Sequence, residues 1–212
     1  MFRMLGAAGL FLLFTGATAA AADEEQAEEL SPEAAKAEYI RLAQELEKLA
    51  SRNAWGGVER TYLALMATGV APTFEDFIAG AQSARASGDI AGTRKRLMAA
   101  TELQEDREIL DWLWDIDSNY GKVFLACVAS GKDPITLSTG TMPFDPAMAG
   151  AVRFAVAQVD EDCLFDGYLP KGEYKFGSKA VDVVPRVQSV RIDLRNMEKS
   201  RGKKKKTGES PE

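Results

Sequence analysis

Residues 73 to 100 read TFEDFIAGAQSARASGDIAGTRKRLMAA, and this stretch predicts two helices joined by a tight turn. Thr73 is a typical N-cap residue, because its side-chain oxygen accepts a hydrogen bond from the first helical turn. Apolar residues then recur on one helical face as far as Gly88-Asp89, which opens a second helix. The stretch is therefore expected to form a helical hairpin.

The same pattern recurs when the sequence is shifted by 35 residues in either direction. Helices are expected from Pro32 to about Arg52, from Asn53 to Gly69 and from Glu105 to Asn119. A register that holds over many positions indicates a repeat with two helices in each unit, and the alternative is a helical bundle with coincidental spacing. The aligned apolar positions are Tyr39, Phe74 and Ile109; Leu42, Phe77 and Trp112; Trp55 and Ile90; and Tyr62 and Leu97.

The period, the two helices per unit and the Gly-Asp start of the second helix resemble the tetratricopeptide repeat over residues 37 to 120. In that family, partner peptides lie along a concave groove formed by the first helix of each unit. The resemblance implies that a protein partner binds there, and that charge reversal at Arg85 weakens partner binding without changing thermal stability. The expected partner-binding residues are those of the second unit, and the alternative is that an array of two units has no usable groove. The groove positions carried over are Ile40, Ala43 and Glu47 in the first unit, Glu75, Ile78, Gln82 and Arg85 in the second, and Leu113 and Asp117 in a partial third unit.

The sequence changes character at Gly121, after which short strands and one inserted helix at 145–162 are expected. Gly131 and Pro134 mark a turn between the first two strands. The run Pro170-x-Gly172-x-Tyr174 resembles the hairpin of small β-sandwich modules of the PEGA and carboxypeptidase-regulatory type. The expected strands are 122–127, 135–139, 168–170, 173–176, 180–184 and 187–194.

These patterns together predict an α+β protein. Its N-terminal α-helical hairpin repeats, tetratricopeptide-like, occupy residues 32–120. Its C-terminal part is a small antiparallel β-sandwich with a helical insertion at residues 121–195.

The N-terminal residues have the three parts of a secretory signal: Arg3, an apolar stretch from Leu5, and small residues up to Ala22. Cleavage after Ala22 removes residues 1–22 and leaves an acidic leader at 23–31. The protein is therefore expected to be exported, periplasmic or secreted. The alternative is an inner-membrane anchor, since about 18 apolar residues are enough to span a bilayer.

The chain contains two cysteines, Cys127 and Cys163. In an oxidising compartment an even pair indicates a disulfide, and the alternative is two buried, unpaired thiols.

Nothing in the sequence indicates a catalytic, metal or cofactor site, and none is expected. The chain has no histidine, which is the commonest general base and a usual metal ligand. Asp115, Asp117 and Asn119 are spaced like the first ligands of a calcium loop. Tyr120 stands where that loop needs glycine, so these residues are expected to be the exposed end of a helix.

The charge distribution argues against nucleic acid as a partner. The net charge is −6, and a basic run at Lys203, Lys204, Lys205 and Lys206 makes the rest of the chain more acidic still. Residues 196–212 are expected to form a disordered basic tail that contacts an anionic surface weakly or stays solvated.

The sequence thus predicts a non-enzymatic protein of the periplasm or cell envelope that acts as a protein–protein interaction or scaffold protein through its helical repeats. The alternative is a ligand-binding module that holds an envelope polymer such as peptidoglycan or another carbohydrate through the β domain. The identity of the partner is left open.

Overall fold

The computed structural model describes residues 31–128, 135–187 and 189–195. The predicted signal, all of the acidic leader before Ser31, and the basic tail with Lys203 to Lys206 lie outside the described residues, as do Gly131 and Pro134 of the predicted turn. In the part of the chain that is described, no helix has the length and apolar character needed to cross a bilayer.

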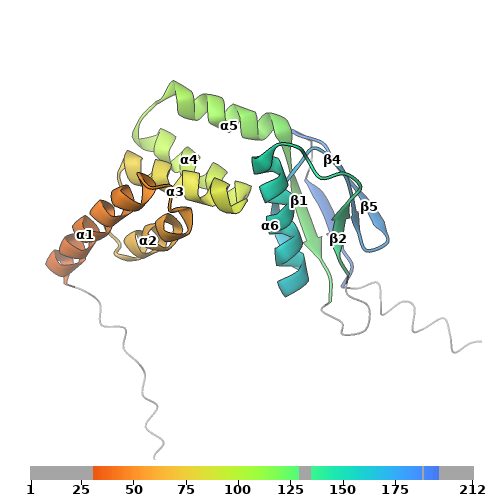
Figure 1. The fold of residues 1–212 in the computed structure, drawn as a ribbon, viewed down its shortest axis with the longest axis horizontal. Helices are drawn as coiled ribbons and strands as arrows, with labels where there is room; N and C mark the ends of the chain where they lie inside the picture. Colours follow the sequence, from red (N-terminus) through yellow and green to blue (C-terminus); the bar gives the residue numbers. More distant parts are fainter. Residues whose placement is uncertain (1–30, 129–134, 188, 196–212) are drawn as a thin grey trace, which may run out of the picture.

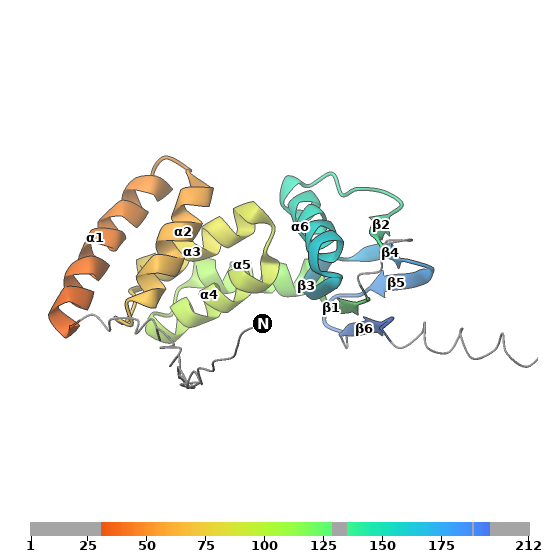
Figure 2. The same cartoon turned by 90° about the horizontal axis from the view of Figure 1, so that it is seen from below.

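Within the described residues 31–119 the chain forms five helices, which pack side by side (Figures 1 and 2). Polar side chains cap several of their N-termini: Ser31 accepts a hydrogen bond from Ala34, and Thr73 forms a capping box with Asp76. The helices are α1 (Pro32–Ala50), α2 (Trp55–Ala67), α3 (Phe74–Ser87), α4 (Ile90–Leu103) and α5 (Arg107–Asn119).

The turns of the two hairpins α1–α2 and α3–α4 share one backbone feature. Asn53 and Gly88 both have a left-handed conformation, with φ of 54° and 88°. They precede α2 and α4 by two residues each, and the starts of these helices, Trp55 and Ile90, are 35 positions apart. The chain therefore reverses in the same way at corresponding places of the two hairpins.

Apolar side chains hold each hairpin together. Leu42, Leu46, Val58, Tyr62 and Leu65 form the core of the first. A second core combines the α3–α4 hairpin with α5 and also includes Ala151, which comes from the other half of the chain.

In the described part of the C-terminal half, the strands form two three-stranded sheets, in the orders β3-β1-β6 and β2-β4-β5. Side chains from both sheets contribute to one core that includes Val123, Leu137 and Phe176. The strands are β1 (Tyr120–Ala126), β2 (Leu137–Thr139), β3 (Leu164–Pro170), β4 (Gly172–Phe176), β5 (Lys179–Val183) and β6 (Val190–Asp193).

The prediction of a purely antiparallel module is wrong at one strand pair. β6 pairs with β1 in parallel, for example Val123 with Val190, whereas the other three strand pairs are antiparallel. The reason is connectivity: β6 follows β5 of the other sheet, so it joins β1 by a crossover and not by a hairpin. β1 and β2, which follow each other in sequence, belong to different sheets.

The predicted inserted helix is present as α6 (Pro146–Asp162), and it lies between the two halves (Figures 1 and 2). Val152, Ala155 and Val159 face the core of the sheets. Ala151 packs in the core of α3, α4 and α5. The α+β class is thus shown, and α6 belongs structurally to both halves.

The structure joins Cys127 and Cys163 in a disulfide. β1 and β3 are paired antiparallel up to Ala126 and Leu164, so the two cysteines occupy the next position of the same ladder. The backbone N–H of Cys127 also donates to the carbonyl of Cys163 at 2.8 Å. The bridge therefore fastens the end of β1 to the point where α6 ends and β3 begins.

Candidate functional site

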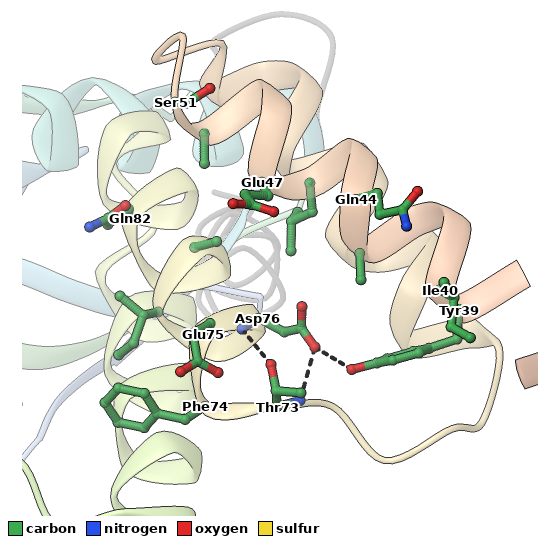
Figure 3. Close-up of a pocket in the computed structure, with 15 residues that line it drawn as sticks. Tyr39, Ile40, Gln44, Glu47, Ser51, Thr73, Phe74, Glu75, Asp76 and Gln82 are labelled. Atoms are coloured by element: carbon green, nitrogen blue, oxygen red, sulfur yellow. Dashed lines mark hydrogen bonds between the residues drawn. The ribbon is translucent and has the colours of Figure 1, made fainter.

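A cleft of about 720 Å³ lies between α1 and α3, and we call it the cleft (Figure 3). Three of the four predicted partner-binding residues, Glu75, Ile78 and Gln82, line it from α3. Their spacing of three and four residues places them on one face of the helix. The α1 wall contains the three groove positions expected in the first unit, Ile40, Ala43 and Glu47, together with Tyr39, Gln44, Leu46, Ala50 and Ser51.

The walls of the cleft are mainly apolar, with small residues where the helices approach each other. Ala43 on α1 and Ala79 on α3 leave space that larger side chains would fill. Ile40 is 49% exposed although it is apolar. An apolar wall that stays open to solvent is typical of a surface that binds a ligand or partner.

Hydrogen bonds around Asp76 fix one end of the cleft. The Tyr39 hydroxyl donates to Asp76 Oδ2 at 2.6 Å, and the backbone N–H of Thr73 donates to the same oxygen at 2.9 Å (Figure 3). Burial, followed by the bond to Asp76, raises the pKa of Tyr39, so the phenol stays a donor. Asp76 therefore ties α1 to the start of α3.

Glu47 and Glu75 differ from Asp76, because both residues are exposed. In the described ranges, no salt bridge involves either residue. Both residues line the cleft, Glu47 from α1 and Glu75 from the first turn of α3 (Figure 3). They are therefore available to a cationic group of a ligand.

Arg85, the fourth predicted residue, lies in an adjoining cavity of about 700 Å³, which we call the arginine cavity. This cavity shares Ala50 and Gln82 with the cleft, and it is also lined by Trp55, Trp112 and, from α6, Arg153. The cleft and the arginine cavity therefore adjoin, and we call the two together the groove.

Arg85 has a structural contact that the sequence did not indicate. Its guanidinium lies over the ring of Trp112, 5.1 Å from the ring centroid. Such cation–π contacts contribute roughly 0.5–1 kcal/mol at exposed sites. Replacement of Arg85 is therefore expected to change thermal stability slightly, contrary to the expectation drawn from the sequence.

Two residues predicted for the groove lie elsewhere. Leu113 packs against the core of α3, α4 and α5. Asp117 accepts hydrogen bonds from Arg94 at 2.8 and 3.2 Å and lines a different cavity. The 35-residue register that relates the first two hairpins thus does not place Leu113 and Asp117 of α5 in the groove. On α5, Trp112 lines the groove instead.

The residues spaced like calcium ligands are engaged with protein groups. Asn119 donates to the Asp115 side chain at 2.8 Å, and Asp117 pairs with Arg94. Among the residues that the structure describes, no group of three or more histidine, cysteine, aspartate or glutamate side chains could hold a metal ion.

A third cavity, of about 540 Å³, lies where α5 meets β1 and β3. Trp114, Tyr120 and Tyr168 line it together with Arg186 and Lys122. Trp114 is 64% exposed, and Arg186 lies 5.3 Å from its ring centroid while also donating to Ser118 at 2.7 Å. The exposed ring of Trp114 beside polar groups suits a sugar or a planar ligand.

Comparisons with protein-family models, with curated proteins and with solved structures found no match. The two resemblances noted in the sequence therefore rest on residue patterns alone. The functional proposal rests on the geometry of the cavities.

Proposed function

We propose that this protein is a non-enzymatic interaction protein of the periplasm or cell envelope, and that its cleft binds a segment of a protein partner. The observation that carries the proposal is the cleft itself, which combines exposed apolar walls with two exposed acidic residues, Glu47 and Glu75. The envelope location rests on the signal-like sequence up to Ala22.

A tetratricopeptide-like array is the architecture we propose for the helical half. The equivalent left-handed residues Asn53 and Gly88, and the equivalent starts of α2 and α4, support it. In such an array the first helices of successive units lie side by side, as α1 and α3 do.

A PEGA-like β-sandwich is the module we propose for the sheets. Gly172, the first residue of β4, has a positive φ of 149° directly after the turn that follows β3. The Tyr174 hydroxyl donates to the Pro170 carbonyl at 2.9 Å, which holds this turn closed. The module would provide spacing or a second contact with the partner.

The acidic groups of the cleft favour binding over catalysis. A carboxyl group that acts as a general acid at neutral pH needs apolar, buried surroundings. Glu47 and Glu75 are exposed, and the buried Asp76 is occupied by Tyr39 and Thr73.

Site-specific photocrosslinking tests the proposal. A photoreactive residue at Ile40, which is 49% exposed in the cleft, is compared with one at Leu63, which is 54% exposed on α2 outside it. In envelope extract, the Ile40 probe is expected to crosslink one discrete protein that the Leu63 probe does not. Equal crosslinking from both positions, or none, would contradict binding in the cleft.

The exposed Trp114 supports a second candidate function, the binding of an envelope polymer in the cavity of Trp114, Tyr120 and Tyr168. Co-sedimentation with purified peptidoglycan tests it, with Trp114→Ala as the variant. Loss of sedimentation in that variant would support polymer binding, and a wild-type protein that stays in the supernatant would exclude it.

A further inference from the structure

The groove is divided by charge. The charged side chains that line the cleft, Glu47, Glu75 and Asp76, are all acidic. Those that line the arginine cavity, Arg85 and Arg153, are both basic. The cleft and the cavity adjoin at Ala50 and Gln82, so a segment long enough to occupy both would meet both charges in turn.

The charges at both ends are available to a ligand. Within the described part of the chain, Arg85 and Arg153 form no salt bridge, and neither do Glu47 and Glu75. The stacking of Arg85 on Trp112 occupies the face of the guanidinium. Its N–H donors lie in the plane of the group and remain free to bind a carboxylate.

The spacing between the two ends follows from α3. Glu75 and Arg85 are ten positions apart on one helix, which corresponds to about 15 Å at the rise of an α-helix. An extended peptide covers this distance in about four or five residues.

The polar groups between the two ends favour an extended segment over a helix. Gln44 and Gln82 lie on opposite walls of the cleft, and each amide offers both donors and an acceptor (Figure 3). An extended backbone needs such partners for its N–H and C=O groups, whereas a helix satisfies them internally.

We propose that the groove selects an extended partner segment in which a lysine or arginine and a carboxylate lie about four or five residues apart, with apolar residues between them. The basic side chain faces Glu75, and the carboxylate faces Arg85 and Arg153. This inference rests on the proposed function of the cleft, and it adds the chemistry and polarity of the occupant.

A displayed library of random peptides tests the proposal, with the full chain immobilised. Peptides of about twelve residues are long enough to show a helical spacing as well as an extended one. The expected result is enrichment of sequences with a basic and an acidic residue about four or five positions apart around an apolar core, and weaker enrichment at high salt.

Charge-reversal variants link the enriched charges to the groove. Arg153→Glu is expected to lower the enrichment of the acidic residue about two- to fivefold, since partly exposed ion pairs are weak, and Glu75→Lys should do the same for the basic residue. Arg85→Glu should match Arg153→Glu, and thermal unfolding checks its fold because Arg85 packs on Trp112. Arg60→Glu is the matched control, because Arg60 is exposed on α2 and lines neither cavity.

The outcomes separate this inference from the proposed function. Apolar peptides without a charge pattern, enriched equally by wild type and variants, would overturn the charge selection but leave cleft binding intact. A spacing of about ten residues would overturn the extended conformation. No enrichment above background would contradict both proposals.

Discussion

Arg96 joins the two helical hairpins through one partly buried cluster of polar groups. Its guanidinium donates to both carboxylate oxygens of Glu59 at 2.6 Å and to the Gly80 carbonyl at 2.6 Å. Ser83 donates to the same carboxylate at 2.6 Å, and the ring of Tyr62 lies 4.2 Å from the guanidinium. Burial would raise the pKa of Glu59, but the bonds from Arg96 and Ser83 outweigh burial and lower it. The guanidinium of Arg96 thus links three helices, α2, α3 and α4.

Arg96→Leu is expected to lower the free energy of unfolding by roughly 2–4 kcal/mol, because it leaves a partly buried carboxylate without its cation. Arg96 is suited to this test, since its side chain is only 11% exposed. Urea unfolding followed by circular dichroism measures the change. Arg41→Leu is the control, because its pairs with Glu38 and Glu45 lie on the surface of α1. Equal effects of the two substitutions would show that the cluster contributes little.

Tyr174 provides a pH-dependent prediction. Burial, followed by the neighbouring Tyr120, raises its pKa from 10.0 to about 12. Between these values the unfolded chain loses a proton that the folded chain retains, so stability falls as the pH rises. Tyr174→Phe should cost about 1 kcal/mol at neutral pH by removing the bond to Pro170, and the difference from wild type should narrow above pH 10. Denaturant unfolding of both proteins from neutral pH to above pH 10 measures this difference in the free energy of unfolding. A difference that stays the same across this range would contradict the raised pKa of Tyr174.

Helix boundaries were predictable because local chemistry determines them. Thr73 and Asp76 form a capping box, and the chain reverses at Gly88, so α3 begins and ends where the sequence indicates. Strand partners depend on distant parts of the chain. The parallel pairing of β6 with β1 brings Val190 beside Val123, and no local pattern specifies it.

The residues that line the groove could likewise be predicted only where local helical spacing determines their position. Glu75, Ile78 and Gln82 share one face of α3, so helical spacing was enough to find them. Arg153 reaches the groove only because α6 packs on α3, which depends on contacts between distant segments. Trp112 aligns with the core positions Leu42 and Phe77, but it lies half-buried under Arg85 at the edge of the groove.

The disulfide between Cys127 and Cys163 is expected to stabilise the β half, since it closes a long loop around β2 and α6. With a sequence separation of 36, loop entropy predicts a contribution of roughly 3–4 kcal/mol. Cys127→Ala/Cys163→Ala should lose this amount in urea unfolding, and a reductant should have the same effect on wild type. The reductant must leave the double variant unchanged. A wild-type protein that is insensitive to reduction would contradict the prediction.

The relative position of the two halves depends on the contact between α3 and α6. Gly88, at the end of α3, lies against Gly150 of α6, and a Cβ atom at Gly88 would come to 2.4 Å from the Gly150 carbonyl oxygen. Ala151, next in sequence, is fully buried in the core shared with α3, α4 and α5. The arginine cavity lies at the same junction, because Gly150 and Arg153 line it together with Arg85. The geometry of the groove is therefore tied to how closely α6 approaches α3.

Gly88→Ala is expected to push the halves apart and to weaken the groove at its arginine end. Its cost combines steric overlap with a left-handed φ of 88°, which alone is unfavourable by roughly 1–2 kcal/mol for a residue with a Cβ atom. Gly69→Ala separates the two effects, because Gly69 also has a positive φ, of 73°, but has open space around it. Gly150→Ala should be neutral or stabilising by up to about 1 kcal/mol, since its nearest neighbour is 4.0 Å away and alanine favours a helix. Thermal unfolding measures the loss of stability, which should be larger for Gly88→Ala than for Gly69→Ala. Small-angle X-ray scattering measures the radius of gyration, which only Gly88→Ala should increase. If the scattering of Gly88→Ala matches that of wild type, the α3–α6 contact does not determine the arrangement of the halves.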